Sequence, residues 1–355
     1  MTLYEKEIEV PPSEDEQEEA IPPRRKFLFT TLTLLLVAVV CLVGLEAGLR
    51  VYCLVKPNAD VEFFRYANLM KANVNGSRVV FMHQPNMKLH LMGVDVETNS
   101  RGFREVEYAA RKEPGTKRIG LLGDSITFGW GVPYGQRFSE IIENRWNTPG
   151  SAPVALINTG HGNYNSTQED AMLEDYLSAD DLDGVIQIWY INDAEPLPVH
   201  RDAPWYSHSY AYIFLWSKYD LMVRRAGNRK NYVDYYRDLY KEGSPGLPEF
   251  KQALQRTGDW TRRHNVPWIF VVLPEFHNFD DNNPFSDIYD EVKRTAASAG
   301  AVVVDVTGDF KGQDPASIWV SYNDVHPNAK GHAIIAEGIL KRVDPTIFVR
   351  QPSGR

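Results

Sequence analysis

After residue 118, apolar residues fall into short, nearly continuous runs that alternate with amphipathic segments. Continuous apolar runs are typical of strands buried on both faces of a sheet. The intervening segments carry apolar residues at helical spacing, which predicts helices packed on both faces. The sequence therefore predicts an α/β fold with a doubly wound, mainly parallel five-stranded sheet. Its expected strands are 118–123, 154–158, 184–192, 267–274 and 301–306.

The pattern is different near the N-terminus, where residues 27–45 contain no charged side chain. A helix of this length spans roughly 30 Å, the thickness of the hydrocarbon core of a bilayer. Arg24, Arg25 and Lys26 immediately precede it and favour a cytoplasmic N-terminus. We therefore expect a single-pass anchor in the cell membrane that contacts the lipid bilayer through residues 27–45, with the rest of the chain extracytoplasmic.

Two other export signals match parts of this N-terminus. A cleaved signal peptide is disfavoured because the apolar stretch is long and no small-residue cleavage site follows it. Arg24 and Arg25 also fit part of a twin-arginine signal, which the strongly apolar stretch disfavours.

The patterning divides the chain into five parts, one of which contains an aromatic-rich helical insertion around 196–245. In order, the parts are a disordered acidic tail (1–26), a transmembrane helix (27–48), an N-terminal extension (49–115), the α/β domain (116–345) and a C-terminal tail (346–355). The aromatic side chains of the insertion either pack its helices together or form a cover over the end of the sheet.

Composition narrows the classes of function. The formal net charge is -9, which argues against nucleic acid as a partner. The only cysteines, Cys41 and Cys53, lie in or beside the apolar segment. The remaining chain therefore has no thiol for a disulfide, a cysteine nucleophile or a thiolate metal site.

A serine follows the first predicted strand in the sequence Gly123-Asp124-Ser125. Ligands bind at the carboxyl ends of strands in open parallel sheets, so a serine on a sharp turn there can attack a carbonyl if a base takes its proton. The alternatives are a phosphate-binding loop and a turn with an N-capping serine. The phosphate loop is disfavoured because the glycine fingerprint is incomplete and no P-loop motif occurs.

The ends of other strands supply groups for the same chemistry. NTGHGNYNSTQ (158–168) offers backbone N–H groups, and Asn192 can donate an amide hydrogen bond to a developing oxyanion. His326 lies in the last loop, two residues after Asp324, and this carboxylate can orient the imidazole. His332 is expected to be structural.

These motifs together resemble the SGNH (GDSL-type) hydrolase family over roughly residues 95–345, and TNSRGFRE (98–105) resembles its membrane-anchored bacterial branch. GDSITFG matches the first conserved block, with Ser125 as nucleophile. YIND matches the third, with Asn192 in the oxyanion hole, and NDVHPN matches the fifth, with His326 as base. The resemblance implies a flavodoxin-like fold and cleavage of carboxylic esters through a Ser-His-Asp acyl-enzyme, with no cofactor and no metal.

Some positions depart from the family pattern. Tyr190 replaces a glycine of the third block, and Asn323 stands where the fifth block has its aspartate, so the neighbouring Asp324 is the expected acid.

The remaining member of the oxyanion hole, beside Ser125 and Asn192, is a backbone N–H of the second block. Its position falls at Gly160, Gly162 or Asn163, and alignment on YNSTQ favours Asn163.

Two alternative functions use the same fold. An O-acyltransferase would pass the acyl group to a sugar hydroxyl, and the sequence does not separate it from a hydrolase. A non-catalytic anchored glycan-binding protein is disfavoured because Ser125, Asn192 and His326 are all present. Export favours an ester substrate outside the cytoplasm, such as an acetylated polysaccharide.

Overall fold

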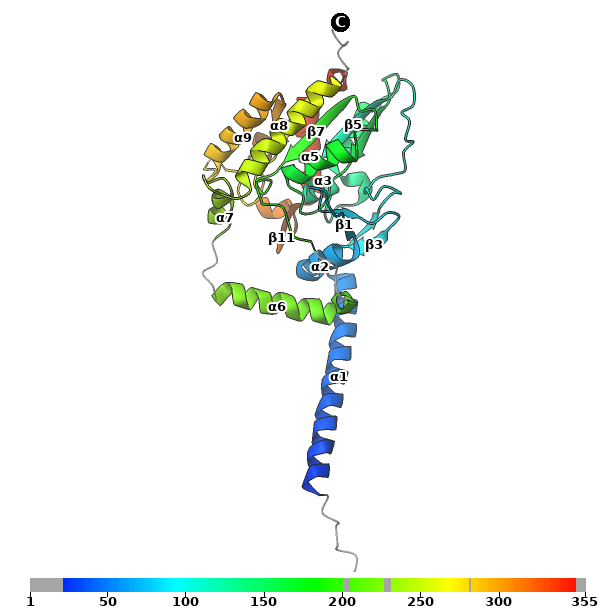
Figure 1. Cartoon of the computed structure of the whole chain (residues 1–355), viewed down its shortest axis with the longest axis vertical. Coiled ribbons are helices and arrows are strands. Elements are labelled where there is room, and N and C mark those ends of the chain that lie inside the picture. Colours follow the sequence, from blue (N-terminus) through cyan, green and yellow to red (C-terminus); the bar gives the residue numbers. More distant parts are fainter. Residues whose placement is uncertain (1–21, 201–204, 227–230, 281, 349–355) are drawn as a thin grey trace, which may run out of the picture. The chain divides into compact units, whose positions relative to one another are not determined.

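The computed structural model describes residues 22–200, 205–226, 231–280 and 282–348. The chain divides into two units, Met1–Val51 and Tyr52–Arg355 (Figure 1). The predicted acidic tail lies outside the described residues as far as residue 21, and the predicted C-terminal tail does so from residue 349.

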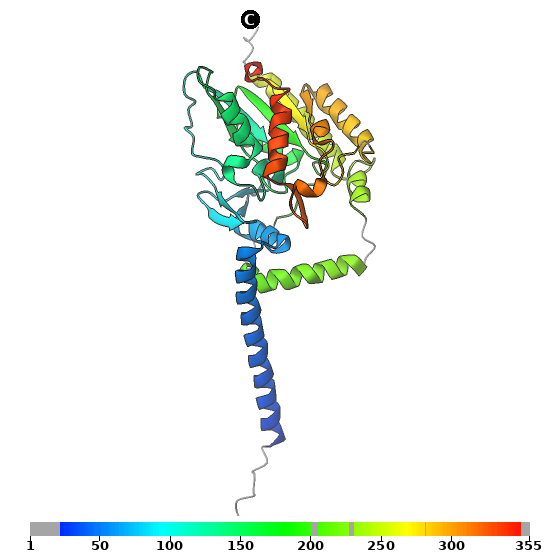
Figure 2. The ribbon, with the colours of Figure 1, turned by 180° about the vertical axis from the view of Figure 1, so that it is seen from behind.

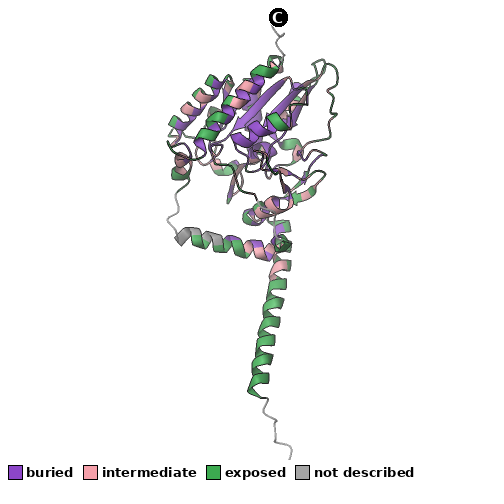
Figure 3. Cartoon of the chain, viewed as in Figure 1, coloured by how far each residue is buried: buried purple, intermediate pink, exposed green. Residues whose placement is uncertain are grey.

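Helix α1 (Pro23–Val55) makes up the described part of the first unit and ends within the second. Its apolar side chains are exposed along most of its length (Figure 3). Among the described helices, it alone is long and apolar enough to cross a membrane. The two charged residues that follow residue 26 in this helix, Glu46 and Arg50, form an ion pair with each other at 2.6 Å. This pairing lowers the cost of placing both charges in an otherwise apolar helix.

A parallel five-stranded sheet forms the centre of the second unit, in the strand order β6-β5-β7-β8-β9. Its strands are β5 (Lys117–Leu122), β6 (Val154–Asn158), β7 (Gly184–Trp189), β8 (Trp268–Val272) and β9 (Val302–Asp305). Every neighbouring pair is parallel. Every residue of β7 and β8 is buried, as their continuous apolar runs predict. The predicted fold class is therefore confirmed.

Helices cover both faces of this sheet. On one face α4 (Phe138–Trp146) contacts α10 (Ala329–Leu340), which is seen in Figure 2. On the other face α8 (Leu247–His264) contacts both α5 (Ser166–Asp175) and α9 (Ser286–Ala299), as Figure 1 shows. The chain order reverses between β5 and β7, so the carboxyl ends of these two strands open a crevice, as is usual in doubly wound sheets.

The N-terminal extension forms short elements that the sequence pattern does not reveal. They are α2 (Ala59–Leu69) and two antiparallel pairs, β1 (Lys71–Asn73) with β2 (Phe81–His83), and β3 (Lys88–Leu91) with β4 (Val94–Glu97). Strands of three or four residues are too short to establish a hydrophobic period. Tyr66 and Met70 of the extension pack in one apolar cluster with Phe128 and Trp130, which follow β5.

The aromatic-rich insertion forms helices η3 (Trp205–His208), α6 (Tyr210–Ala226) and α7 (Tyr232–Leu239). Ile213 of α6 is buried against Val61 of α2, whereas Trp216 and Tyr219 of α6 are exposed. Tyr236 of α7 reaches the cavity described below. Neither expectation for the insertion, core packing or a cover, therefore describes all of its aromatic side chains.

Short elements complete the second unit. They are α3 (Ser125–Phe128), η2 (Tyr134–Gln136), η4 (Thr307–Phe310), η5 (Pro315–Ser317), β10 (Trp319–Ser321), β11 (Asp324–Pro327) and η6 (Pro345–Ile347).

Gly160 lies where the loop after β6 meets the backbone of α3. A Cβ atom at Gly160 would lie 2.2 Å from the nitrogen of Phe128 and 2.5 Å from the carbonyl carbon of Thr127. Because both are backbone atoms, they cannot move aside as a side chain can.

We expect Gly160→Ala to lower the free energy of unfolding by roughly 1–3 kcal/mol, because the added methyl group forces the loop away from α3. Chemical denaturation of the full chain in detergent, followed by tryptophan fluorescence, measures this change. Gly135→Ala is the matched control, since a Cβ at Gly135 meets no atom within 4 Å. Equal unfolding free energies for the two variants would contradict the packing argument.

Candidate active site

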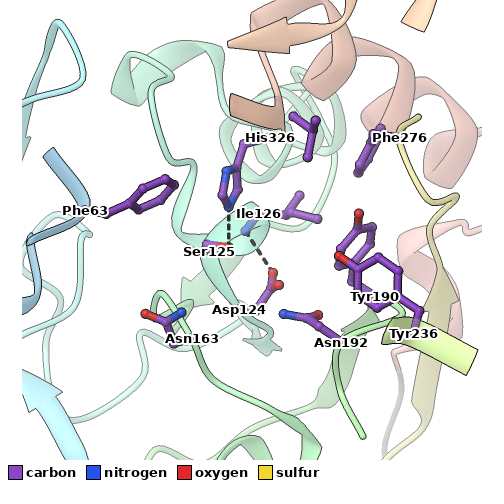
Figure 4. A pocket seen from close by; sticks show the side chains of 11 residues that line it. Phe63, Asp124, Ser125, Ile126, Asn163, Tyr190, Asn192, Tyr236, Phe276 and His326 are labelled. Atoms are coloured by element: carbon purple, nitrogen blue, oxygen red, sulfur yellow. Dashed lines mark hydrogen bonds between the residues drawn. The ribbon is translucent and has the colours of Figure 1, made fainter. Parts of the chain in front are cut away.

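A tight turn after β5 places Ser125 at the first position of α3. Asp124, not the serine, caps this helix, because its Oδ1 accepts a hydrogen bond from the N–H of Ile126 at 2.8 Å. Gly123 allows the turn to close, since a Cβ there would lie 2.0 Å from Thr127 Oγ1. The capping role that the sequence offered as an alternative for Ser125 thus belongs to its neighbour, and the hydroxyl of Ser125 faces the cavity (Figure 4).

Three of the predicted site residues form one chain of hydrogen bonds. Ser125 Oγ lies 2.8 Å from His326 Nε2, although the two residues are 201 positions apart in the sequence. His326 Nδ1 lies 2.5 Å from Asp324 Oδ1. Because Nδ1 faces a carboxylate it carries the proton, which leaves Nε2 free to accept the proton of the serine hydroxyl.

A short hairpin carries the histidine and its carboxylate. The sequence predicts a loop here, but β10 and β11 pair antiparallel, and Asp324 and His326 both lie in β11. Asp324 is buried, whereas Asn323 just before it is exposed. Asp324, and not Asn323, is therefore the residue whose side chain contacts His326, and its role as the acid stays a prediction.

Two aromatic side chains that were not predicted, Trp130 and Phe63, pack beside His326. The indole N–H of Trp130 donates to Asp324 Oδ2 at 2.7 Å, so both carboxylate oxygens are engaged. Phe63 of the N-terminal extension stacks on Trp130, with ring centroids 4.8 Å apart, and its ring centroid lies 5.8 Å from that of His326. Trp130 is adjacent to the predicted motif in sequence, but nothing in the sequence indicates that its N–H bonds a residue of the distant hairpin.

The charges of this pair shift its pKa values in opposite directions. Burial opposes the charged imidazolium of His326, but the charge and hydrogen bond of Asp324 outweigh it and raise the pKa of His326. Burial likewise opposes the Asp324 carboxylate, but His326 and the donors around it lower the pKa of Asp324 below its ordinary value. Asp324 is therefore ionised at neutral pH and stabilises a protonated His326.

The three second-block candidates differ in what their N–H groups contact. The N–H of Gly160 donates to Asn158 Oδ1 at 2.9 Å, and the N–H of Gly162 donates to the Tyr66 hydroxyl at 2.7 Å. Asn163 lines the cavity with a left-handed backbone, at φ +67°. Of the three, Asn163 is therefore the residue placed to offer its N–H to a ligand.

Asn192 reaches the same cavity from the end of β7. Its amide nitrogen points toward Asp124 (Figure 4), while its buried Oδ1 has no hydrogen-bond partner among the described residues. Burial raises the pKa of Asp124, and the hydrogen bonds from Ile126 and Asn192 partly offset that rise. Asp124 thus holds the amide of Asn192 in place at the cavity floor.

The cavity has a volume of about 330 Å³. Polar groups from Asp124, Ser125, Asn163, Asn192 and His326 meet apolar walls, which are formed by Phe63, Ile126, Tyr190, Tyr236, Phe276 and Val325. Tyr190, which replaces the family glycine, stacks on Phe276 with ring centroids 5.7 Å apart. A small, largely apolar cavity with a few convergent polar groups is typical of a small-molecule site.

His332 lies outside the cavity. His332 is buried, its Nδ1 accepts the N–H of Phe138 at 3.1 Å, and burial lowers its pKa to about 3, so it acts as a neutral packing residue.

Within the described ranges, no cluster of three or more His, Cys, Asp or Glu side chains is arranged to hold a metal ion.

Comparison with known proteins places this geometry in a family. Residues 121–334 match the profile of the GDSL-like Lipase/Acylhydrolase family. Among curated proteins, no relative matches the chain.

Several solved structures are similar to this chain at low identity. LAE5, an alpha/beta hydrolase enzyme from the metagenome of Lake Arreo, Spain, is 19% identical with a TM-score of 0.42, over 63% of this chain and 94% of its own. TesA is 13% identical with a TM-score of 0.43, over 64% and 99%. Axe2, an acetylxylan esterase from Geobacillus stearothermophilus, is 19% identical with a TM-score of 0.42, over 66% and 97%.

The family profile covers more than half of the chain and includes the strand-end serine, the Asn192 segment and the histidine hairpin. The chain belongs to the GDSL-like lipase/acylhydrolase family and is an SGNH-type hydrolase of ester bonds.

Proposed function

We propose that the protein cleaves esters through an acyl-enzyme formed on Ser125. The observation that supports this most directly is the hydrogen-bonded chain from Ser125 through His326 to Asp324 beside the cavity. As Ser125 Oγ attacks the ester carbonyl, its proton passes to His326 Nε2. The imidazolium that forms is stabilised by the Asp324 carboxylate and then protonates the leaving alcohol. Water repeats the sequence and releases the acid.

The oxyanion that forms during attack needs donors fixed in advance. We assign this role to the backbone N–H groups of Ser125 and Asn163 and to the side-chain amide of Asn192. All three residues line the cavity. Losing one such donor costs on the order of 3 kcal/mol in the barrier, because the donors act where negative charge appears in a site of low dielectric.

The substrate that we propose is an O-acetylated extracytoplasmic glycan. The cavity of about 330 Å³ suits a small acyl group better than a long chain. The rings of Phe63, Tyr190 and Tyr236 line its walls and offer flat apolar faces on which a sugar ring can pack. Free acetate as the product supports hydrolysis, whereas acetyl transfer to an added sugar would support the O-acyltransferase alternative.

We also propose that residues 27–45 anchor the chain in the cell membrane, with a cytoplasmic N-terminus and an extracytoplasmic hydrolase domain. The exposed apolar surface of α1 supports the span. The basic residues just before it, Arg24, Arg25 and Lys26, support the orientation.

We expect Ser125→Ala to lower kcat by roughly 10⁴–10⁶-fold on p-nitrophenyl acetate and on an O-acetylated polysaccharide, because it removes the nucleophile. The melting temperature should stay nearly unchanged, since Ser125 is only half-buried and its side chain makes one hydrogen bond. Acetate release and thermal unfolding of the full chain in detergent measure both. Turnover retained in the purified variant would exclude Ser125 as the nucleophile.

Asp324→Asn should lower kcat by roughly 10³–10⁴-fold with a smaller change in KM, because the lost charge acts mainly in the transition state. It should also move the pH profile. In the native chain kcat/KM should rise with pH through a midpoint above ~6.5, the ordinary histidine value, because Asp324 raises the pKa of His326. In the variant the charge of Asp324 no longer opposes the effect of burial, and only the charge of Asp124 still raises the pKa of His326, so the midpoint should move to lower pH.

The control for Asp324→Asn is Asn323→Ala, which changes an exposed side chain next to it and should alter kcat by less than about threefold. A large loss of kcat in Asn323→Ala, together with a nearly native kcat in Asp324→Asn, would show that the acid is assigned to the wrong residue.

The full chain should remain in the membrane pellet after alkaline carbonate extraction, because an uncharged 19-residue span inserts stably. Protease added from the extracytoplasmic side should digest the hydrolase domain. Release by carbonate, or digestion only from the cytoplasmic side, would contradict the proposed anchor and its orientation.

A further inference from the structure

Lys71 is a buried lysine that the family match does not include, because it precedes residue 121. It begins β1 in the N-terminal extension. Its Nζ donates to Asn163 Oδ1 at 2.8 Å and lies 4.0 Å from the centre of the Phe81 ring and 4.9 Å from that of Tyr66. No ion pair joins it to a carboxylate of the described residues. Burying an amine without a counter-ion is costly, so Lys71 is unlike an ordinary packing residue.

Tyr66 of α2 holds the residue next to Asn163. Its hydroxyl oxygen accepts the N–H of Gly162 at 2.7 Å and lies 2.6 Å from His83 Nε2. His83 Nδ1 faces the carbonyl oxygen of Gly102, so Nδ1 carries the proton and Nε2 accepts from the tyrosine. A Cβ at Gly162 would lie 2.7–2.9 Å from the phenol group of Tyr66, so the loop packs tightly here.

The extension therefore forms hydrogen bonds to two consecutive residues of the second-block loop, to the N–H of Gly162 and to the side chain of Asn163. Asn163 has φ +67°, a left-handed conformation that non-glycine residues rarely adopt. Asparagine tolerates it better than most residues, and here the hydrogen bond from Lys71 fixes the side chain that accompanies it. The peptide between Gly162 and Asn163 is thus held from both sides, and with it the direction of the Asn163 N–H.

We propose that Lys71 and Tyr66 are positioning residues that hold the Asn163 N–H in the oxyanion hole, an inference that rests on the proposed acyl-enzyme mechanism. Burial lowers the pKa of Lys71 to about 7. Because a neutral amine still has two N–H donors, the contact to Asn163 does not require the charge.

A positioning role predicts which kinetic constant changes. The N–H of Asn163 bonds the oxyanion, which exists only after attack, so a misdirected donor lowers kcat and leaves KM nearly unchanged. Loss of a donor lowers kcat by about 10²–10³-fold, and a donor that is displaced but present should lower it by roughly 10–100-fold.

The test is a double-mutant cycle on the full chain in detergent with p-nitrophenyl acetate. Lys71→Met removes the donor while keeping the length of the side chain, and should lower kcat by roughly 10–100-fold. Asn163→Gly removes the acceptor and should also lower kcat. Because both changes break the same hydrogen bond, Lys71→Met should cause no further loss in the Asn163→Gly background. Tyr66→Phe, which keeps the ring but removes the acceptor of the Gly162 N–H, should lower kcat as well.

Two more readouts separate positioning from a structural role. Inhibition by an alkyl trifluoromethyl ketone, whose hemiketal oxygen occupies the oxyanion hole, should weaken by the same factor as kcat in Lys71→Met. The melting temperature of Lys71→Met should not fall, since an apolar side chain replaces a buried amine that has no counter-ion among the described residues. Lys88→Met, in the same extension with a side chain that is 76% exposed, is the control and should keep full activity.

Three outcomes would overturn the inference: native kcat in Lys71→Met, fold-losses that multiply in the double variant, or inhibition by the trifluoromethyl ketone that is as strong in Lys71→Met as in the native chain. Each is distinguishable from failure of the mechanism itself, because Ser125→Ala would then still be inactive. If Ser125→Ala retained turnover, the mechanism would fail first and the inference with it.

Discussion

The buried carboxylate of Asp324 is the group on which the geometry of the site depends. Its two oxygens accept from different parts of the chain, one from His326 in the same hairpin and the other from the indole of Trp130 after α3. A buried charge left without these donors would be strongly destabilising, so the hairpin and the turn must meet. Gly131 allows this close contact between the turn and the hairpin, since a Cβ there would lie 2.7 Å from a methyl group of Val320 in β10. Because Trp130 and Ser125 belong to one short segment, satisfying Asp324 also brings His326 to Ser125.

The N-terminal extension fixes the same segment from the opposite side. The guanidinium of Arg104, which is buried, donates to the carbonyl oxygens of Phe128, Gly129 and Val132 around the turn. Phe63 covers Trp130, which keeps water away from the bond to Asp324 and strengthens it. The family match begins at residue 121, so these contacts come from outside the matched region. The extension is thus part of the site's support, and the hydrolase fold alone does not account for the rigidity of the turn.

The features that the sequence predicted are those in which residue type and local pattern suffice. Buried strands appear as continuous apolar runs, and a serine, an asparagine and a histidine at strand ends can be recognised one motif at a time. The contribution of the extension was not predictable in this way, because its strands are too short to show a period. Trp130 and Lys71 act through contacts 194 and 92 residues away along the chain, and no local pattern encodes such contacts. The choice among Gly160, Gly162 and Asn163 likewise depended on which N–H groups other residues already use.

Several carboxylate side chains are buried close together beside the cavity. Burial raises the pKa of Asp124 and, together with the nearby Glu169 and Asp124, raises that of Asp193. Grouping carboxylates in a buried region opposes folding unless protons or donors compensate. β7 ends shortly before Asp193, and β7 and β8 are both buried along their whole length. Fixed donors lower a reaction barrier only if they need not reorganise when charge develops. Holding polar groups fixed at the buried strand ends therefore costs folding energy and, for the same reason, favours catalysis.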